Sequence, residues 1–436
     1  MLHEKKVIDL FSTLGFNEDY FNQVAIDSRF KKRFRTLLGI DYVFALIVNA
    51  ANTTISYNTL ASSLAEDPRK SVCKQALHKA MAKDSFVKFL EQIFRDVLLS
   101  KLEINSRKLR LKFKRIIIQD STIIKLPKRL FSEFSGVKNG FVQVASARIQ
   151  FALNILSNSL IHFDLDSYSV NDIAAKQLPI QEADLVLRDR GYFSIQEISR
   201  ILKAKADFIY RYKHGLLYHD ITTGKAIDLL KRLHKSKVTD IMVRLSGING
   251  PIVRLIAMPI SIELANNRRA KLKKDASSTP KNEVLALLSW SIFITSIDDE
   301  EISYEEIFKL YKLRWRIEII FKAMKSHLSL DHIHNVPKPQ LEFIILIKIV
   351  MMILILQFIY EPLRKPVNQF HNKDISLLKL TKFLIDNKNI LGDLIALANS
   401  KKINDCTHLK LLAKYCAYEK RTKRLNFIEQ FECVYA

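Results

Sequence analysis

The sequence has 436 residues, of which 48% are hydrophobic, and this size predicts a globular protein of two or three domains. Lys and Arg number 69 against 45 Asp and Glu, so the formal net charge is +24. Such an excess favours a polyanionic partner, with nucleic acid as the leading candidate, and the apolar content excludes a disordered chain.

The N-terminal segment M-L-H-E-K-K-V-I-D-L lacks the apolar core of a signal peptide, so we expect no export. His332 and His334 form an H-x-H pair without a cysteine or acidic partner at a zinc-site spacing, and we interpret them as surface or loop residues. The cysteines are scattered and include no C-x-x-C pair, which fits a reducing cytosol; they are Cys73, Cys406, Cys416 and Cys433. A cytoplasmic location follows.

Residues 1–105 have helical patterns and no strand-like run. Within them, the segment 55–81 contains two helical patterns separated by a polar break at Asp67 and Pro68. This arrangement is compatible with a helix-turn-helix unit that reads DNA, and equally with a small helical hairpin that has no such role.

From residue 109 the sequence changes to short apolar runs typical of strands. Helix-like segments at 173–182 and 195–204 lie between the later runs. Three adjacent strands followed by alternating helix and strand predict a mixed α/β sheet. The predicted strands are 115–119, 148–156, 160–165, 184–187 and 207–212.

Residues 213–286 look like an insertion, with predicted strands at 241–245 and 252–258 and a basic stretch that ends in a turn-rich segment. A strand at 289–297 and a long helix then resume the α/β pattern, and the chain closes with helices. The apolar run 341–359 is interrupted by Glu342 and Lys348. We expect a buried helix there, since a membrane span needs roughly 20 apolar residues with few charges.

Two of the predicted strands end in the same way, in I-I-I-Q-D-S and L-V-L-R-D-R, each with an aspartate after its apolar run. Uninterrupted apolar strands belong in a sheet covered on both faces, so both strands should be central. Because α/β sheets bind ligands at the carboxyl ends of their strands, Asp120 and Asp189 should converge on one site if the strands are neighbours. The alternative is that each aspartate only caps a turn.

The segment 311–325, Y-K-L-R-W-R-I-E-I-I-F-K-A-M-K, predicts one helix with a single carboxylate among many cations. At 100° per residue, Tyr311, Arg314, Glu318 and Lys325 form one narrow stripe about 21 Å long. The stripe lies at the edge of an apolar arc that should face the core; the arc consists of Leu310, Leu313, Ile317, Ile320, Phe321 and Met324.

This stripe resembles a track for a nucleic-acid backbone, in which cations hold phosphates on both sides of the carboxylate. Glu318 would repel a phosphate unless a divalent cation lay between them, and carboxylate oxygens suit Mg²⁺ or Mn²⁺. The alternative is a solvated face on which Glu318 pairs with Arg314, worth about 0.3–0.5 kcal/mol. We expect Trp315, just beyond the stripe, to pack in the core.

These residues resemble a known family. The spacing of Tyr311, Arg314, Glu318 and Lys325 is similar to the Y-R-E-K signature of the insertion-sequence-4 group of bacterial DDE transposases. Q-D-S-T at 119–122 looks like the first acidic motif of that family, and D-R-G-Y-F at 189–193 looks like the second. The three motifs span residues 120–325.

The resemblance implies a ribonuclease-H-like mixed sheet core with a β-rich insertion, flanked by helical N- and C-terminal regions. It divides the chain into a DNA-binding region, two parts of a catalytic core around the insertion, and a helical region used in assembly. These segments are 1–105, 106–212, 213–286, 287–340 and 341–436.

The resemblance also implies a mechanism. Asp120, Asp189 and Glu318 would hold two Mg²⁺ (or Mn²⁺) ions that hydrolyse phosphodiester bonds at terminal inverted repeats and then transfer the strand to target DNA. No covalent protein intermediate is needed. The expected partner is double-stranded DNA, bound by a homodimer in a synaptic complex in the bacterial cytoplasm, associated with the nucleoid and not with a membrane.

The implied DNA contacts are Tyr311, Arg314 and Lys325, together with Arg190, Tyr192 and Lys322. Whether cleavage passes through a DNA hairpin stays open, because neither tryptophan lies clearly inside the insertion. Two other readings also stay open: a metal-dependent DNA nuclease on the same core, and a non-catalytic DNA-binding regulator derived from a transposase.

Overall fold

The computed structural model describes residues 11–12, 15–65, 67–99, 113–136, 143–170, 172, 177–236, 238–247, 249–276, 278–298, 302–400 and 402–419. The chain forms two compact units. Unit 1 comprises Met1–Arg107, Ser121–Asn171 and Trp315–Glu429, and unit 2 comprises Lys108–Asp120, Asp172–Arg314 and Gln430–Ala436. The finer five-segment division stays a prediction.

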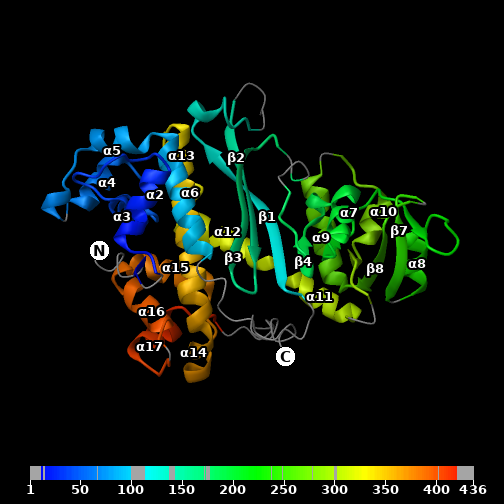
Figure 1. The fold of residues 1–436 in the computed structure, drawn as a ribbon. Helices are drawn as coiled ribbons and strands as arrows, with labels where there is room; N and C mark the ends of the chain where they lie inside the picture. The colour runs from blue at the N-terminus through cyan, green and yellow to red at the C-terminus, as the bar shows by residue number, and fades with distance from the viewer. Residues whose placement is uncertain are drawn as a thin grey trace. The chain divides into compact units, whose positions relative to one another are not determined.

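The described residues of the N-terminal part of unit 1 form helices joined by loops and contain no strand, as the sequence predicts (Figure 1). The two patterns of segment 55–81 form α4 and α5, and the polar break between them is a 3₁₀ turn whose N-cap is Asp67. Its helices are α2 (Glu18–Asp27), α3 (Gly39–Asn49), α4 (Tyr57–Leu64), η1 (Pro68–Lys70), α5 (Lys74–Met81) and α6 (Asp84–Leu99).

The C-terminal part of unit 1 contains the long apolar helix α13 (Lys338–Ile355), which packs against α6 and α3 and continues through η4 (Leu356–Tyr360) into α14 (Glu361–His371). This helix is long and apolar enough to cross a membrane, but 94% of its most apolar window is buried inside the protein, which fits the predicted core helix. The remaining helices are η2 (Lys128–Leu130), α12 (Trp315–His327), α15 (Leu377–Asp386), η5 (Lys388–Ile390), α16 (Leu391–Ala398) and α17 (Thr407–Tyr415).

Aromatic and polar contacts join α13 to the N-terminal helices. The rings of Phe343 and Phe86 lie 5.7 Å apart, and the Lys348 ammonium, on a residue only 1% exposed, donates to the carbonyls of Ala50, Asn52 and Leu328 at 2.9, 3.0 and 2.7 Å. Lys348 thus ties α13 to the loop after α3 and to the end of α12.

The strands follow the order β3-β2-β1-β4-β5-β9-β8-β7-β6 in one mixed sheet. With the flanking helices this confirms the predicted α/β class, and all eight predicted strands are present. The strands are β1 (Arg115–Leu126), β2 (Ala145–Asn154), β3 (Ser159–Ser167), β4 (Asp184–Arg188), β5 (Asp207–Arg211), β6 (Tyr218–Asp220), β7 (Thr239–Leu245), β8 (Ile252–Pro259) and β9 (Trp290–Thr295).

Unit 2 contains the parallel part of the sheet. β1 pairs with β4 and β4 with β5, both in parallel, and α7 (Ile195–Lys203) forms the crossover as the sequence predicts. The predicted helix 173–182 is wrong for residues 177–182, which contain no helix, and its residues 173–176 lie outside the described chain. Ala183, at positive φ, and the extended residues before it lead the chain directly into β4.

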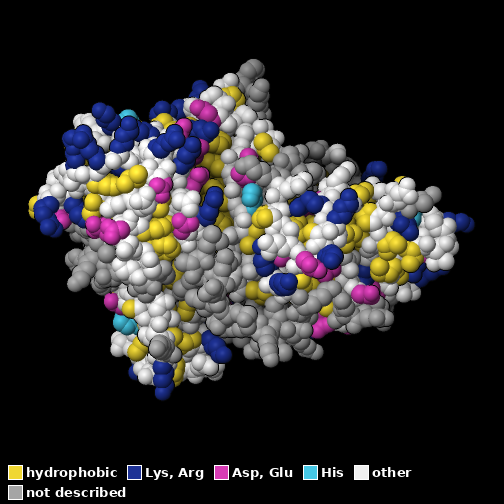
Figure 2. Space-filling view, in the orientation of Figure 1, with side chains coloured by type: hydrophobic (Ala, Val, Ile, Leu, Met, Phe, Trp, Pro, Cys, Tyr) yellow, Lys and Arg dark blue, Asp and Glu magenta, His cyan; other side chains and the backbone are white. Residues whose placement is uncertain are grey.

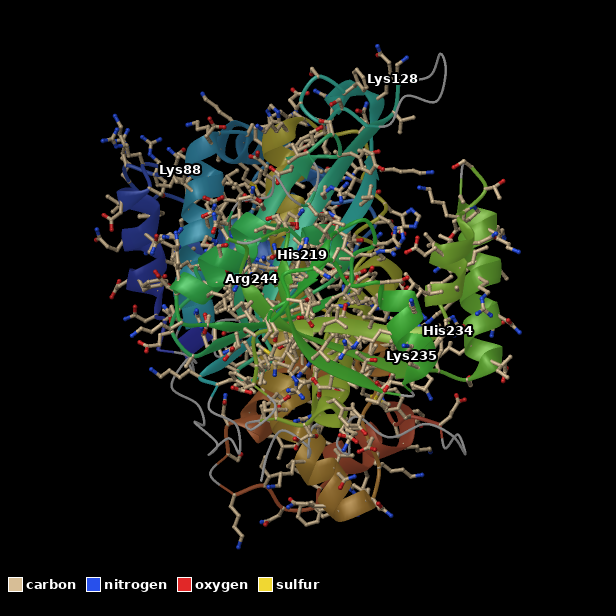
Figure 3. All side chains as sticks on the ribbon, turned by 90° about the vertical axis from the view of Figure 1, so that its right-hand side faces the viewer. Lys88, Lys128, His219, His234, Lys235 and Arg244 are labelled. Atoms are coloured by element: carbon tan, nitrogen blue, oxygen red, sulfur yellow. The ribbon has the colours of Figure 1, made fainter. Side chains whose placement is uncertain are left out.

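The described part of segment 213–286 contains helices as well as strands, namely β6, β7 and β8 with α8 (Leu229–Lys235), α9 (Ile262–Asp275) and α10 (Asn282–Leu287). Its strands extend the sheet beyond β9, because β8 pairs with β9. β6 is the edge strand at this end of the sheet, opposite the edge formed by β3, and His219 on β6 lies opposite Arg244 on β7 (Figure 3).

Candidate active site

Three neighbouring parallel strands of unit 2 place polar residues in one row. Gln119 of β1 lies opposite Arg188 of β4, and Arg188 lies opposite Tyr210 of β5. The residues that come next in the chain are therefore Asp120 after Gln119, Asp189 after Arg188, and Arg211 after Tyr210. Since neighbouring strands are about 4.8 Å apart, the two aspartates directly follow paired residues on neighbouring strands, with an arginine beside them, while their convergence on one functional site stays a prediction.

The two aspartates have different local settings. β1 does not end at Asp120, as the sequence suggested, because only its pairing with β4 ends there and the strand continues to Leu126. Asp189 is the N-cap of a 3₁₀ turn, η3 (Arg190–Tyr192), and accepts a hydrogen bond from the Arg190 backbone N–H at 2.8 Å. Capping and a functional role are thus compatible for Asp189.

Arg314 lies beside this row and binds Asp120. Its Nη1 donates to Asp120 Oδ2 at 2.9 Å, with the arginine side chain 4% and the aspartate side chain 24% exposed. The guanidinium that the sequence assigns to a phosphate is therefore buried against a carboxylate of the same site. It fixes the orientation of Asp120 and offsets part of its negative charge.

Tyr311 is buried in the same part of unit 2. Its hydroxyl donates to the Arg188 carbonyl at 3.3 Å, and its ring centroid lies 5.7 Å from both the Arg314 and the Arg211 guanidinium carbons. Burial raises the pKa of Tyr311 to about 12, with the Asp189 charge acting in the same direction. The phenol is therefore protonated at neutral pH and is a hydrogen-bond donor.

Glu318 is carried by α12 in unit 1. The predicted single helix over 311–325 is wrong: α11 (Tyr304–Lys312) ends, and α12 begins at Trp315. Between them, Leu313 and Arg314 donate to the carbonyls three residues back, which tightens the turn. The apolar arc is confirmed, because all six of its residues are buried.

One face of α12 carries a tryptophan, a carboxylate and two lysines. Trp315, Glu318, Lys322 and Lys325 fall within about 80° of one another on the helix. Trp315 is 51% exposed, so the expectation that it packs in the core is wrong; the apolar arc is filled by other residues, and Trp315 lies outside it. Glu318 is half-buried in the first turn, where the helix dipole favours a carboxylate.

The two lysines of this face differ. Lys322 is exposed, whereas Lys325 is half-buried and donates to the Ile123 carbonyl on β1 at 2.9 Å. Burial lowers the pKa of Lys325. Lys325 therefore anchors α12 to β1 within unit 1 and presents only part of its side chain to a ligand.

Of the two predicted contacts from the second motif, Arg190 is exposed and Tyr192 is 5% exposed. Tyr192 belongs to the core cluster that contains Val186 and Phe208. A packing role accounts for Tyr192, while Arg190 is available to a ligand.

Sequence reasoning missed one arginine in each unit, Arg211 in unit 2 and Arg148 in unit 1. Arg211 ends β5 just as the aspartates follow their apolar runs, so the same strand-end rule could have found it. Arg148 on β2 donates to the hydroxyl of Ser121 at 3.2 Å and lies over the ring of Tyr168 at 5.2 Å. Only its occurrence inside an apolar strand could have drawn attention to it.

Among the described residues, no group of three or more His, Cys, Asp and Glu side chains is arranged to hold a metal ion. The candidate ligands nevertheless suit one class of ion. All are carboxylates, which are typical ligands of Mg²⁺ and Mn²⁺.

The family described as "Transposase DDE domain" matches residues 111–354, which include Asp120, Asp189, Tyr311, Arg314 and Glu318. The chain belongs to this family. The predicted DDE transposase resemblance is confirmed at the family level, while the Y-R-E-K signature itself stays a prediction.

Two transposases show how far this DDE family similarity extends. The chain is 27% identical to the transposase of insertion sequence element IS1151 from Clostridium perfringens, over 74% of each chain. It is 25% identical to that of IS231C from Bacillus thuringiensis subsp. berliner, over 85% of this chain and 83% of that protein. Similarity therefore includes segments on both sides of the DDE domain.

A solved structure titled as a piggyBac transposase synaptic complex with hairpin DNA aligns with 98% of this chain and 87% of that chain. The TM-score is 0.41 and the identity is 11%, so no residue of the DDE transposase is assigned from it.

Proposed function

We propose that this DDE transposase performs cut-and-paste transposition, with Asp120, Asp189 and Glu318 as the acids that hold its divalent ions. The observation that carries the proposal is the adjacent, parallel placement of Asp120 and Asp189 in a chain of the DDE family. Glu318 supplies the third carboxylate by family resemblance.

Asp120, Asp189 and Glu318 would hold two Mg²⁺ or Mn²⁺ ions, which would supply activation of a nucleophile and stabilisation of the leaving oxygen of a phosphodiester. The chain supplies the rest. Arg314 keeps Asp120 in position through its 2.9 Å hydrogen bond, and Arg211, beside Asp189, provides a positive charge for a phosphate oxygen. Lys322 and Arg190 are exposed cations that can follow the DNA backbone.

A nucleophilic tyrosine would be a different mechanism. Burial raises the pKa of Tyr311 to about 12, and its hydroxyl donates to a backbone carbonyl. A nucleophile requires a lowered pKa or an adjacent base, so Tyr311 is better suited to positioning. Its contact with Arg188 places it directly beside the strand that carries Asp189.

The partner of this activity is DNA, as terminal inverted repeats and as target. Transposition joins two ends, so the active assembly contains at least two protomers in a synaptic complex. We place the protein in the bacterial cytoplasm with the nucleoid, in keeping with its net charge of +24.

The test uses a duplex of the inverted repeat that flanks the coding region, incubated with Mg²⁺ and the wild type or the Asp120→Ala, Asp189→Ala or Glu318→Ala variant. The wild type should cut and then join the repeat to target DNA, while each variant should do neither. Glu305→Ala, an exposed acid on α11, is the matched control and should keep full activity. Cuts without joined products would favour a nuclease, and binding without cuts would favour a regulator.

A further inference from the structure

Behind the two aspartates, the sheet of unit 2 carries a buried row of polar side chains. Successive side chains of a strand point to opposite faces, so the residues that precede Asp120, Asp189 and Arg211 lie on the other face of the sheet. Each of these preceding residues is at most 3% exposed. The row consists of Gln119, Arg188 and Tyr210, on β1, β4 and β5.

Arg188 is the charged member of this row, and α7 supplies its counter-ion. Its Nη1 donates to Glu197 Oε1 at 2.6 Å and to the Tyr210 hydroxyl at 3.1 Å, and the guanidinium lies over the Tyr192 ring at 5.5 Å. The Arg188 side chain is 4% exposed and that of Glu197 is 15% exposed. Because a charge buried to this degree needs a partner, Glu197 is what permits an arginine at this position.

Glu197 is itself held firmly on α7. Arg200 donates to both of its carboxylate oxygens, from Nε at 2.8 Å and from Nη2 at 2.6 Å, and the Glu197 backbone N–H donates to the N-cap side chain of Ser194 at 3.1 Å. Burial alone would raise the pKa of Glu197, but the hydrogen bond from Arg200 and the charge of Arg188 lower it overall. Glu197 is therefore ionised at neutral pH.

The backbone of Arg188 is held as well. Its carbonyl accepts a hydrogen bond from the Tyr311 hydroxyl on α11 at 3.3 Å. The next residue is Asp189, which caps η3. Arg188 is thus fixed through its side chain by α7 and through its carbonyl by α11, so a shift of Arg188 moves the Asp189 carboxylate.

Glu197 also sets the charge behind the aspartates. It is the only acidic residue of α7, whereas Arg200 and Lys203 of the same helix are basic. Figure 2 shows further Lys and Arg side chains on the surface around α7 and α9. Without Glu197, the charge of Arg188 would be uncompensated one residue from Asp189, and a nearby positive charge disfavours a bound cation.

We propose that Glu197 is a positioning residue for Asp189, which acts through Arg188 to orient the Asp189 carboxylate toward a divalent ion and to balance the charge behind it. Removal of a residue that holds a metal ligand in place typically lowers metal affinity or activity by about 10–100-fold. This role requires no contact of Glu197 with the ion or with DNA. The inference rests on the proposed function for the role of Asp189 as a metal ligand.

A purely structural role of the ion pair is the alternative, and an apolar replacement separates the two. Removal of one partner of a buried pair destabilises a protein, whereas replacement of both partners by apolar residues of similar volume is often neutral or stabilising. The double variant Arg188→Met/Glu197→Leu should therefore be about as stable as the wild type. It should still bind the ion weakly, because nothing then ties the residue before Asp189 to α7.

The test measures Mn²⁺ binding to the full-length protein without DNA, by the paramagnetic resonance signal of the free ion, together with urea unfolding of each variant. Glu197→Gln keeps the shape of the side chain and removes its charge, so it should raise the dissociation constant for Mn²⁺ by about 10–100-fold. Glu197→Asp, which keeps the charge, should restore part of the affinity. In the inverted-repeat cleavage assay, Glu197→Gln should need a correspondingly higher Mg²⁺ concentration for its half-maximal rate.

Glu182→Gln is the matched control, since Glu182 is an acid of unit 2 whose carboxylate lies 3.6 Å from the Lys205 ammonium in an exposed ion pair. It should leave Mn²⁺ affinity unchanged. Wild-type Mn²⁺ affinity in Glu197→Gln, or recovery of both stability and affinity in the double variant, would overturn the positioning role.

Asp189→Ala separates this inference from the proposed function. Unchanged Mn²⁺ binding in Asp189→Ala would contradict the role of Asp189 as a ligand. Weaker binding in Asp189→Ala with wild-type binding in Glu197→Gln would leave the proposed function intact and overturn only the role of Glu197.

Discussion

Lys348 offers a test of how the Glu318-bearing part of unit 1 is held together. Its ammonium is buried against three carbonyls, one of which is Leu328, just after α12. Burial lowers the pKa of Lys348 to about 8, from an ordinary value of 10.5. The Lys348→Met variant keeps the apolar stem and removes the titrating group.

The sign follows from the protons bound by each state. Between pH 8 and 10.5 the unfolded chain holds the lysine proton more tightly than the folded protein, so stability rises with pH in that window. A shift of about 2.5 units corresponds to roughly 3 kcal/mol, since one unit is worth about 1.4 kcal/mol. Below pH 8 Lys348 is charged in both the folded and the unfolded state, so the folded protein bears the full free-energy cost of burying that charge.

Urea unfolding of the wild type and of Lys348→Met, from pH 7 to 10.5, isolates this residue because all other groups titrate alike in both proteins. The free energy of unfolding of the wild type should gain about 3 kcal/mol relative to the variant across the window. At pH 7 the variant should still be less stable, since three buried carbonyls lose their donor. A difference that stays flat or shrinks with pH would refute the lowered pKa.

Four further predictions concern the site. Arg314→Ala should lower the free energy of unfolding by about 1.5–3 kcal/mol, the range for a hydrogen bond to a charged group, and Arg314→Lys should retain part of that but lose DNA cleavage in the duplex assay. Tyr311→Phe should lower the free energy of unfolding in urea by about 0.5–1.5 kcal/mol, and the variant should still cut DNA. Complete loss of cutting would favour a mechanism in which Tyr311 is the nucleophile. Arg211→Ala should flatten the salt dependence of DNA binding by about one unit, and an unchanged slope would remove Arg211 from the phosphate contacts. Because Trp315 is exposed, Trp315→Ala should change stability by about 0.5 kcal/mol; a loss of 3–5 kcal/mol would show that it is buried after all.

The strands could be predicted from sequence because buried strands read as uninterrupted apolar runs. β6 was missed because it is a three-residue edge strand without such a run. The basic stretch after residue 261 gave no structural prediction, yet it forms most of α9, whose N-cap is Ser261 and whose Ala, Leu, Lys and Arg are strong helix formers.

The site could be predicted only in part. Asp120 and Asp189 followed from a local rule, since each comes directly after an apolar run. The contact between Arg314 and Asp120 joins residues 194 positions apart, and no periodicity carries such information. Helical positions at 100° per residue over 311–325 identified the buried residues correctly but assumed one unbroken helix. The tightened turn at Leu313 contains no Pro or Gly that would have indicated a break.

The central claim is that three carboxylates bind the metal ions that cut DNA, and exchange of the ligand atom tests it most directly. Asp120→Cys, Asp189→Cys and Glu318→Cys should each abolish cleavage with Mg²⁺, which binds thiolate poorly, and regain it in part with Mn²⁺, which accepts softer ligands more readily. Cleavage with Mg²⁺ at the wild-type rate in any of the three variants would contradict the account for that residue.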